Sequence, residues 1–481
     1  MKFSISRYFF ILIFCGLSNL ATAQDKQLYE AVSKKVQIAF NTEDPMNIYA
    51  LTSPAYKEKM STSTFISGTK KFYIKTGKWE SLQFREETDG GMVFTAHFER
   101  EIQLFFLQLD EQGRISRFNF KSIPFVKTSK SYLVAGNNPL LTPVDSLVER
   151  LVRPYIQQGH TVGLSIAVIQ KGKVNRYSYG EVKKGSNQLP DPQKTIYEIG
   201  SVTKTFTSLL LAREVVRKKM DLMVPINTYL SKDIPGLHYK NTPITLQNLA
   251  NHTSGLPRLP ANIFLGAVDP TNPYSHYNED SLYSFLKTYQ PSVIPGSQFS
   301  YSNYGAGLLG SILSQNAHRS FEQLVLERIS LPLKMKDTRI ELRAEDKIRL
   351  AQGYNEKGEA TGLWDLVSLQ GSGAIKSTLN DMVRYTQAQL GQFGNALEEA
   401  ILLTHRETFH SQENTMGLGW RIDMQKDNIY WHHSGGTGGF RSFVGFDKKH
   451  QLGVVLLSNT AEDVTKIGQG ILEKYLANSK K

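Results

Sequence analysis

The sequence predicts an α+β protein with two domains. Between residues 26 and 121, helix-like segments are followed by short strand-like runs, and between residues 143 and 478, strand-like runs stand at both ends of a mostly helical middle. At ~100 to 200 residues per domain, a chain of 481 residues has room for two or three domains. The second pattern predicts an antiparallel sheet covered by helices, in which the first and last segments lie close together.

An apolar run from Tyr8 to Leu17 is typical of a secretory signal peptide. Basic residues precede it, and it leads to the small residues Ala21-Thr22-Ala23. We therefore expect a signal peptide at residues 1–23, cleavage after Ala23, and a periplasmic or secreted product. The alternative is an N-terminal membrane anchor, which would need ~18 or more apolar residues to span a bilayer.

Cys15, inside this run, is the only cysteine. We therefore expect the mature chain to contain no disulfide, no thiolate metal site and no cysteine nucleophile. A lipoprotein would need a small residue where the sequence has Phe14. The formal net charge of +12 would attract polyanions, but Lys and Arg are scattered among acidic residues, so we expect no nucleic-acid binding.

Residues 24–130 are predicted to form a small α+β domain. Its helical part is broken at Asp44-Pro45 and Ser53-Pro54, and its strand part contains a hairpin around Asp110 to Gly113. Helices followed by a curled antiparallel sheet resemble the cystatin-like or nuclear-transport-factor-like domains. The sequence identifies no partner for this domain.

Residues 131–142, which contain Gly, Asn and Pro, are predicted to be a linker to a second domain at 143–481. In that domain we expect helices and hairpins at both ends. They are a helix over 144–157, a hairpin of 163–169 and 174–180, a hairpin of 441–446 and 452–458, and a helix over 462–476.

The first motif that could take part in catalysis is Ser201-Val202-Thr203-Lys204, at the start of a helix-like segment. Residues i and i+3 are neighbours on a helix, so the hydroxyl lies beside the amine. A hydroxyl on rigid backbone, next to an amine that loses its charge on burial, suits nucleophilic catalysis. The alternative is a serine N-cap with a solvated lysine, and the same spacing recurs at Ser67 and Ser284.

The second motif is Tyr301-Ser302-Asn303, which follows a loop and precedes a helix of small residues. A lysine ammonium lowers the pKa of a neighbouring tyrosine, which then serves as a proton shuttle. An amide two residues further on can hydrogen-bond a substrate carbonyl. The alternative is a packed loop tyrosine.

The third motif, His433-Ser434-Gly435-Gly436, joins a polar strand end to glycines. Glycine lets a substrate backbone approach a strand edge, and an N–H there can form an oxyanion hole together with the nucleophile's own N–H. The alternative is a glycine-rich turn with a surface histidine.

The order of these motifs, with Asn251-His252-Thr253-Ser254-Gly255-Leu256-Pro257 and Met416-Gly417-Leu418-Gly419-Trp420, resembles a known family. From about residue 143 to 478 the chain is similar to the penicillin-recognising serine hydrolases of class C β-lactamase-like type, which include D,D-carboxypeptidases, D-aminopeptidases and esterases. The resemblance implies a β-lactamase/transpeptidase-like fold, with an antiparallel sheet flanked by helices plus an all-helical region.

The resemblance also implies a role for each motif residue. The nucleophile would be Ser201, with Lys204 and Tyr301 exchanging its proton. The substrate would be held by Asn303, His433, Ser434 and Gly435, and the oxyanion hole would be formed by the N–H groups of Ser201 and Gly436. Neither a cofactor nor a metal is implied, and the other histidines, including His252, would be structural or surface residues.

His433 departs from the family pattern, which has a lysine there. A lysine is a permanent cation, whereas a histidine near its reference pKa of ~6.5 is largely neutral at neutral pH. We therefore expect an exported D-alanyl peptidase or esterase that acts on a peptide or small molecule, for which the cell wall is one source. The alternatives are a β-lactamase and a non-catalytic receptor for wall fragments. We also expect His433 to gain charge near pH 6 and then to favour carboxylate-bearing substrates.

Overall fold

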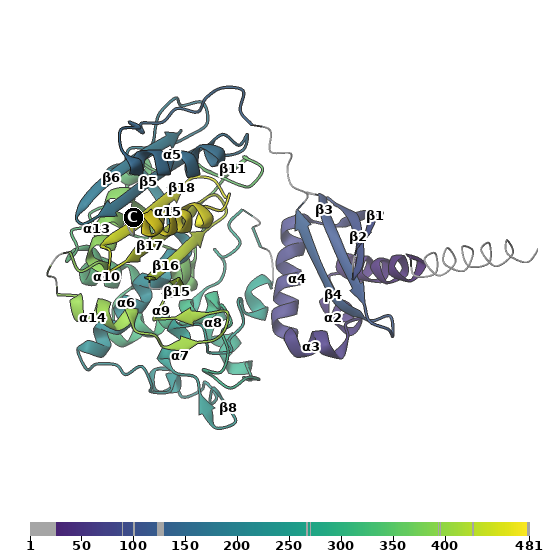
Figure 1. The fold of residues 1–481 in the computed structure, drawn as a ribbon. Helices are drawn as coiled ribbons and strands as arrows, with labels where there is room; N and C mark the ends of the chain where they lie inside the picture. Colours follow the sequence, from purple (N-terminus) through teal and green to yellow (C-terminus); the bar gives the residue numbers. More distant parts are fainter. Residues whose placement is uncertain are drawn as a thin grey trace, which may run out of the picture. The chain divides into compact units, whose positions relative to one another are not determined.

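The computed structural model divides the chain into two compact units, Met1–Phe125 and Val126–Lys481 (Figure 1). It describes residues 26–88, 90–99, 102–122, 129–265, 268–269, 271–392, 394, 396–425 and 428–478. The predicted signal peptide at residues 1–23 lies outside this range. Across the described residues, no helix is both long enough and apolar enough to cross a membrane.

The first unit packs helices against an antiparallel sheet with the strand order β1-β2-β3-β4. The helices are residues 26–41, α2 (Pro45–Ala50), α3 (Pro54–Lys59) and α4 (Thr62–Thr76). The strands are β1 (Trp79–Thr88), β2 (Gly91–Phe98), β3 (Ile102–Leu109) and β4 (Ile115–Ser122). This unit is α+β, as the sequence predicts.

The two predicted helix breaks in this unit are helix starts. Asp44 and Ser53 cap α2 and α3 with their side chains, and a proline follows each cap at the first helical position, where its missing N–H leaves no bond unmade. The predicted hairpin joins β3 to β4, where the Asp110 carboxylate accepts hydrogen bonds from turn N–H groups. The core is aromatic and includes Trp79 and Phe105, both almost fully buried.

The second unit is built on an eight-stranded antiparallel sheet with the order β13-β14-β15-β16-β17-β18-β5-β6. In that order the strands are Phe409–His410, Thr415–Met416, Arg421–Gln425, Asn428–Gly436, Arg441–Asp447, Leu452–Ser458, Gly163–Gln170 and Lys173–Gly180. Strand β5 pairs along its length with β18. This pairing confirms that the two ends of the unit lie together.

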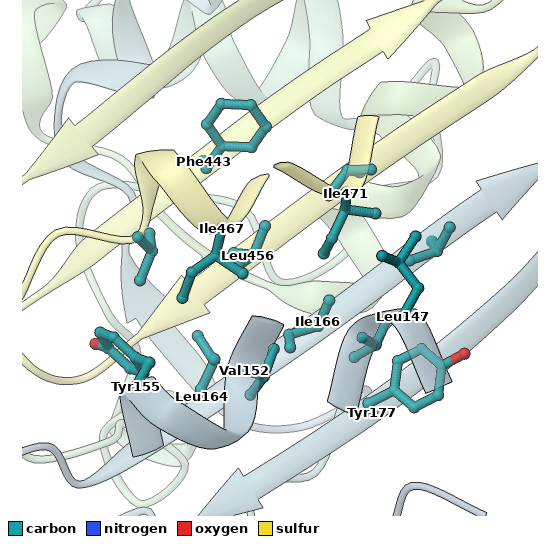
Figure 2. Packing of buried hydrophobic residues seen from close by; sticks show 14 of the residues in the cluster. Leu147, Val152, Tyr155, Leu164, Ile166, Tyr177, Phe443, Leu456, Ile467 and Ile471 are labelled. Atoms are coloured by element: carbon teal, nitrogen blue, oxygen red, sulfur yellow. The ribbon is translucent and has the colours of Figure 1, made fainter. Parts of the chain in front are cut away.

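Helices cover both faces of this sheet. On one face, α5 (Pro143–Ile156) and α15 (Thr465–Asn478) enclose an apolar core, in which Val152, Ile166 and Leu456 lie together (Figure 2). On the other face lies α13 (Leu379–Gln389), whose Thr386 lies against Gly453 of β18. Leucine, valine and isoleucine on both faces of the central strands therefore become buried, which explains their nearly continuous apolar sequence.

The middle of the unit is mostly helical, as expected. Its helices are α6 (Thr203–Val216), α7 (Leu246–Ala250), α8 (Glu279–Thr288), α9 (Asn303–Ala317), α10 (Phe321–Val325), α11 (Ala344–Lys347), α12 (Gln370–Gly373) and α14 (Glu398–His405). Its short strand pairs are β7 (Ile196–Glu198) with β12 (Lys376–Thr378), β8 (His238–Tyr239) with β9 (Thr242–Pro243), and β10 (Gly353–Tyr354) with β11 (Ala360–Thr361). The predicted fold, an antiparallel sheet flanked by helices plus a helical region, is confirmed.

The segment predicted as a linker, residues 131–142, packs onto the second unit. Gly136 forms a β-bridge with Tyr179, and the Asn138 amide donates to the Tyr179 hydroxyl at 2.8 Å. Val134 is buried in the core. Gly, Asn and Pro in this segment therefore shape an ordered edge rather than a free connector.

Candidate active site

Ser201 lies in the short helix η1 (Gly200–Val202), where the chain turns from β7 into α6. Gly200 has a φ of +48°, and a Cβ there would lie 2.6 Å from the backbone N of Gly436. Only glycine allows both this backbone conformation and this close approach. The chain around Ser201 is thus held against the end of β16.

Lys204, one helical turn further on, is 2% exposed. Its Nζ donates to Ser201 Oγ at 3.0 Å, to Asn303 Oδ1 at 2.9 Å and to the Ser372 carbonyl oxygen at 2.6 Å. Burial lowers the pKa of Lys204 below the ordinary lysine value, and Tyr301 partly offsets this shift. The alternative of a solvated lysine is wrong, because all three partners are protein atoms inside the fold.

Tyr301 completes a compact group with Ser201 and Lys204. Lys204 Nζ lies 4.9 Å from the centre of its ring. Burial by itself raises the pKa of the Tyr301 hydroxyl, but the charge of Lys204 and hydrogen bonding with Lys204 and Ser201 outweigh it, so the pKa is lowered. A lysine and a tyrosine that both lose their protons more easily than usual can pass a proton to and from Ser201.

Asn303 begins α9, whose N-cap Ser302 accepts a hydrogen bond from Gly305 N. Its side-chain oxygen is already bonded to Lys204. The side-chain NH₂ group is therefore the part of this amide left to donate, and donation to a carbonyl is the role that the sequence predicts.

The third motif forms the end of β16, paired with β17 from His433 opposite Val444 to Gly436 opposite Arg441. A Cβ on Gly435 would lie 3.0 Å from Ser201 N. The backbone of Ser201 and that of Gly436 therefore meet along one seam. This places the two predicted oxyanion-hole residues next to each other.

His433 is buried, so the alternative of a surface histidine is wrong. Its ring centre lies 6.5 Å from that of Tyr301, and its Nδ1–H donates to the Ser434 carbonyl at 2.7 Å. Burial, together with the charge of Lys204, lowers the pKa of His433 to about 3. The expectation that His433 gains charge near pH 6 is therefore wrong, because an imidazole in this position stays neutral there.

A small cavity of about 30 Å³ opens beside the nucleophile. Its lining includes Ser201, Asn303 and Gly436. It also includes Tyr274 and Trp364, whose rings meet edge to face at 5.1 Å. A substrate carbonyl would thus enter beside polar groups and carry an apolar neighbour against the aromatic wall.

Two residues near Tyr301 were not identified from the sequence as part of the site. The Arg258 guanidinium lies 5.1 Å from the centre of the Tyr301 ring, and within the described residues it makes no ion pair or hydrogen bond. The ring of His252 lies 4.4 Å from that of Tyr301, and its Nδ1 accepts from Ser302 N at 3.2 Å. His252 is thus a buried structural residue, as expected, but one that packs against the site.

The geometry defines a serine hydrolase, with a serine, a buried lysine and a tyrosine in mutual reach beside a small cavity. The Beta-lactamase family model matches residues 148–473, so the chain belongs to the beta-lactamase family and thus to the penicillin-recognising serine hydrolases. No group of three or more metal-ligating side chains occurs among the residues that the structure describes.

Similar proteins from bacteria support this family assignment. The beta-lactamase of Pseudomonas fluorescens is 29% identical over 352 residues, which cover 66% of this chain and 94% of the relative. The beta-lactamase of Escherichia coli strain K12 is 29% identical over 351 residues, which cover 66% and 89%.

Solved structures show the same fold. A class C beta-lactamase superimposes with a TM-score of 0.60 at 26% identity, covering 69% of this chain and 96% of that chain. A beta-lactamase/D-alanine carboxypeptidase from Pseudomonas syringae superimposes with a TM-score of 0.60 at 24% identity, covering 69% and 99%.

Proposed function

We propose that this protein is an exported D-alanyl peptidase or esterase that acts through an acyl ester on Ser201. The observation that carries the proposal is the buried Lys204 ammonium, which donates to Ser201 Oγ at 3.0 Å and lies against Tyr301. Both groups have lowered pKa values, as a proton-accepting pair requires. Export rests on the sequence pattern of residues 1–23.

The reaction follows from these positions. Ser201 Oγ attacks the carbonyl carbon of an amide or ester, and its proton passes to the Lys204–Tyr301 pair. The N–H groups of Ser201 and Gly436 stabilise the oxyanion. The C–N or C–O bond then breaks, and the leaving group takes the proton from the pair. Water then attacks the carbonyl carbon of the acyl ester and gives its proton to the pair. The bond to Ser201 Oγ breaks, Oγ takes the proton back, and the acyl group leaves as a carboxylic acid.

Arg258 supplies the positive charge for an anionic substrate group in this proposal. The neutral His433 cannot pair with a carboxylate as the family's lysine would. The exposed Arg258 guanidinium is a permanent cation that lies against the Tyr301 ring and makes no ion pair or hydrogen bond with any residue that the structure describes. A substrate carboxylate would therefore approach from the Arg258 side of the site.

Hydrolysis of β-lactams is the second candidate. It is favoured by the names of the relatives, which are beta-lactamases. A β-lactam offers the same electrophile, an amide carbonyl near a carboxylate. A non-catalytic receptor is the remaining alternative, and the close contact of Ser201 with Lys204 argues against it.

The test is turnover of D-alanyl peptides, β-lactams and short-chain esters by the mature protein, with mass spectrometry after exposure to a fluorophosphonate. We expect one adduct, on Ser201, and turnover of at least one peptide or ester. Ser284→Ala is the matched control for Ser201→Ala, because Ser284 has the same spacing to a lysine but lies exposed on α8. Failure of every probe to modify Ser201 would favour the receptor, and turnover of β-lactams alone would favour the second candidate.

A further inference from the structure

The small unit contains an apolar cavity of about 260 Å³, which is lined by residues of this unit. It lies between helix α4 and strand β4, which face each other in this unit (Figure 1). Its walls include Phe72 of α4 and Phe118 and Phe120 of β4, which are only half-buried although they belong to the aromatic core. Concave surfaces lined mainly by apolar and aromatic side chains are typical of sites for small molecules.

Gly68 lines this cavity from the interior of α4. Its backbone is helical, and a Cβ there would meet no atom within 4 Å. Neither conformation nor packing therefore requires glycine, although glycine inside a helix is less stable than alanine. The consequence of the missing side chain is that the cavity stays open.

The chemistry of the lining limits what can bind. Every side chain that lines the cavity is uncharged, so a carboxylate, phosphate or ammonium would lose its hydration without compensation. The Phe72 and Phe120 rings stack at 4.5 Å, and the Tyr56 ring stacks on Phe118 at 6.0 Å. Flat or flexible apolar groups suit such walls.

The hydroxyl of Tyr56, which belongs to the lining, is a polar group that can select a ligand. The Tyr56 hydroxyl makes no hydrogen bond with any residue that the structure describes, whereas the neighbouring Tyr49 hydroxyl donates to the Met60 carbonyl. Tyr56 is half-buried, and burial raises the pKa of its hydroxyl, which therefore keeps its proton. A protonated phenol without a partner can donate to an acceptor on a ligand.

We propose that this cavity binds a small, uncharged apolar molecule, such as a neutral ring or short acyl group, that carries one carbonyl or ether oxygen. The oxygen accepts a hydrogen bond from Tyr56, and the apolar part lies among the phenylalanine rings. This proposal does not depend on the function proposed for the second unit.

The experiment is a fluorine NMR titration of the full chain with 4-fluoroacetophenone, which is neutral, carries a carbonyl and has no bond that a serine hydrolase cleaves. We expect saturable binding of one molecule per chain. The charged 4-fluorobenzoate should bind at least tenfold more weakly, because the lining offers it no cation. Absence of saturable binding of the ketone, or equal binding of the benzoate, would overturn the proposal.

Gly68→Leu tests the location, because its side chain would extend into the cavity from a helix that tolerates leucine. We expect at least a tenfold loss of ketone binding with an unchanged circular dichroism spectrum. Gly362→Leu is the matched control, since Gly362 is also exposed with no atom within 4 Å of a Cβ but lies in the second unit. Equal effects of the two variants would place the binding elsewhere and overturn the proposal.

Tyr56→Phe tests the hydrogen bond and remains informative if Gly68→Leu does not fold. It should weaken 4-fluoroacetophenone roughly three- to tenfold, as expected for one hydrogen bond, and leave 4-fluorotoluene unchanged. Equal weakening of both ligands would overturn the assignment of Tyr56 as the donor. Self-association of the parent that Gly68→Leu abolishes would instead assign the cavity to a second copy.

Discussion

The cavity beside Ser201 and the cavity of the small unit are built on opposite principles. Beside Ser201 the free space is about 30 Å³, and the buried Lys204 ammonium is held by three hydrogen bonds. In the small unit the space is about 260 Å³, its lining carries no charge, and the Tyr56 hydroxyl has no partner among the described residues. A catalytic site must hold its charged groups in place before the substrate binds. An apolar site gains affinity because the ligand buries apolar surface that is exposed to water in the free protein.

The two sites also differ in how strongly each affects the stability of the folded protein. A buried ammonium without partners is destabilising by several kcal/mol, so Lys204 requires all of its acceptors. An uncovered apolar wall forgoes only ~25 cal/mol for each Å² that could have been buried. We therefore expect substitutions at the catalytic group to be more damaging than substitutions at the cavity of the small unit.

The largest expected effect is the loss of all turnover and labelling in Ser201→Ala. The stability should change by only about 1 kcal/mol, because Lys204 keeps two of its three acceptors. Ketone binding by the small unit should be unchanged, and Gly68→Leu should in turn leave turnover unchanged. Activity assays measure turnover, thermal melts measure stability, and the fluorine NMR titration measures ketone binding. Residual turnover in Ser201→Ala at the parent rate would remove Ser201 as the nucleophile.

The next effect concerns the proton-transfer pair. Tyr301→Phe should lower kcat/KM for a neutral ester by roughly 10² to 10⁴-fold, the usual contribution of a general acid–base group. In the parent, kcat/KM should rise with pH, since the pair accepts the Ser201 proton only after losing one of its own. The rise should occur below pH ~10, because both pKa values lie below their ordinary range. A rise in kcat/KM that occurs only above pH ~10 would contradict this mechanism.

A smaller, selective effect is expected for Arg258→Met. For a substrate that carries a carboxylate, kcat/KM should fall about tenfold, or about 1.4 kcal/mol, while a matched neutral ester should change less than threefold. Arg319→Met is a suitable control, because Arg319 is also exposed. Its ion-pair contact, at 4.0 Å, is with Glu327, which does not belong to the site. Equal losses on both substrates would show that Arg258 acts only through Tyr301.

The smallest effect is expected for His433. Because burial and Lys204 hold its pKa at about 3, it stays neutral from pH 5.5 to 8. The ratio of apparent affinities for matched carboxylate and neutral substrates should therefore vary less than twofold over that range, and His433→Gln should keep the ratio. A preference for the carboxylate that grows toward pH 5.5 in the parent and disappears in His433→Gln would contradict the buried, neutral state.

The sequence was sufficient to predict the pairing of the second unit's ends and the meeting of Ser201, Lys204, Tyr301 and Asn303. Spacing along the chain accounts for the one helical turn between Ser201 and Lys204 and for the helix start at Asn303. The meeting of these two segments was implied by the resemblance to the penicillin-recognising serine hydrolases. The buried state of His433 could not be predicted in this way. Burial depends on β17 and on the loop of Tyr301, which are distant in sequence.

Arg258 and Gly68 were missed for a similar reason. Arg258 is one cation among many, and what distinguishes it is the Tyr301 ring that the fold brings beneath it. From the sequence alone, Gly68 is a helix residue that lowers helix stability, and only the structure shows the empty space beside it. The linker prediction at 131–142 used composition alone, which does not distinguish an ordered edge held by Tyr179 from a free segment.

The pairing of β5 with β18 has a consequence for how the chain folds. Strand β5 is synthesised long before β18, the neighbour that covers its edge. Until then β5 presents unpaired N–H and C=O groups to any other chain. Contacts so distant in sequence slow folding, so the second unit should complete its sheet only after β18 has been synthesised, and should refold slowly from denaturant with aggregation as its competing outcome.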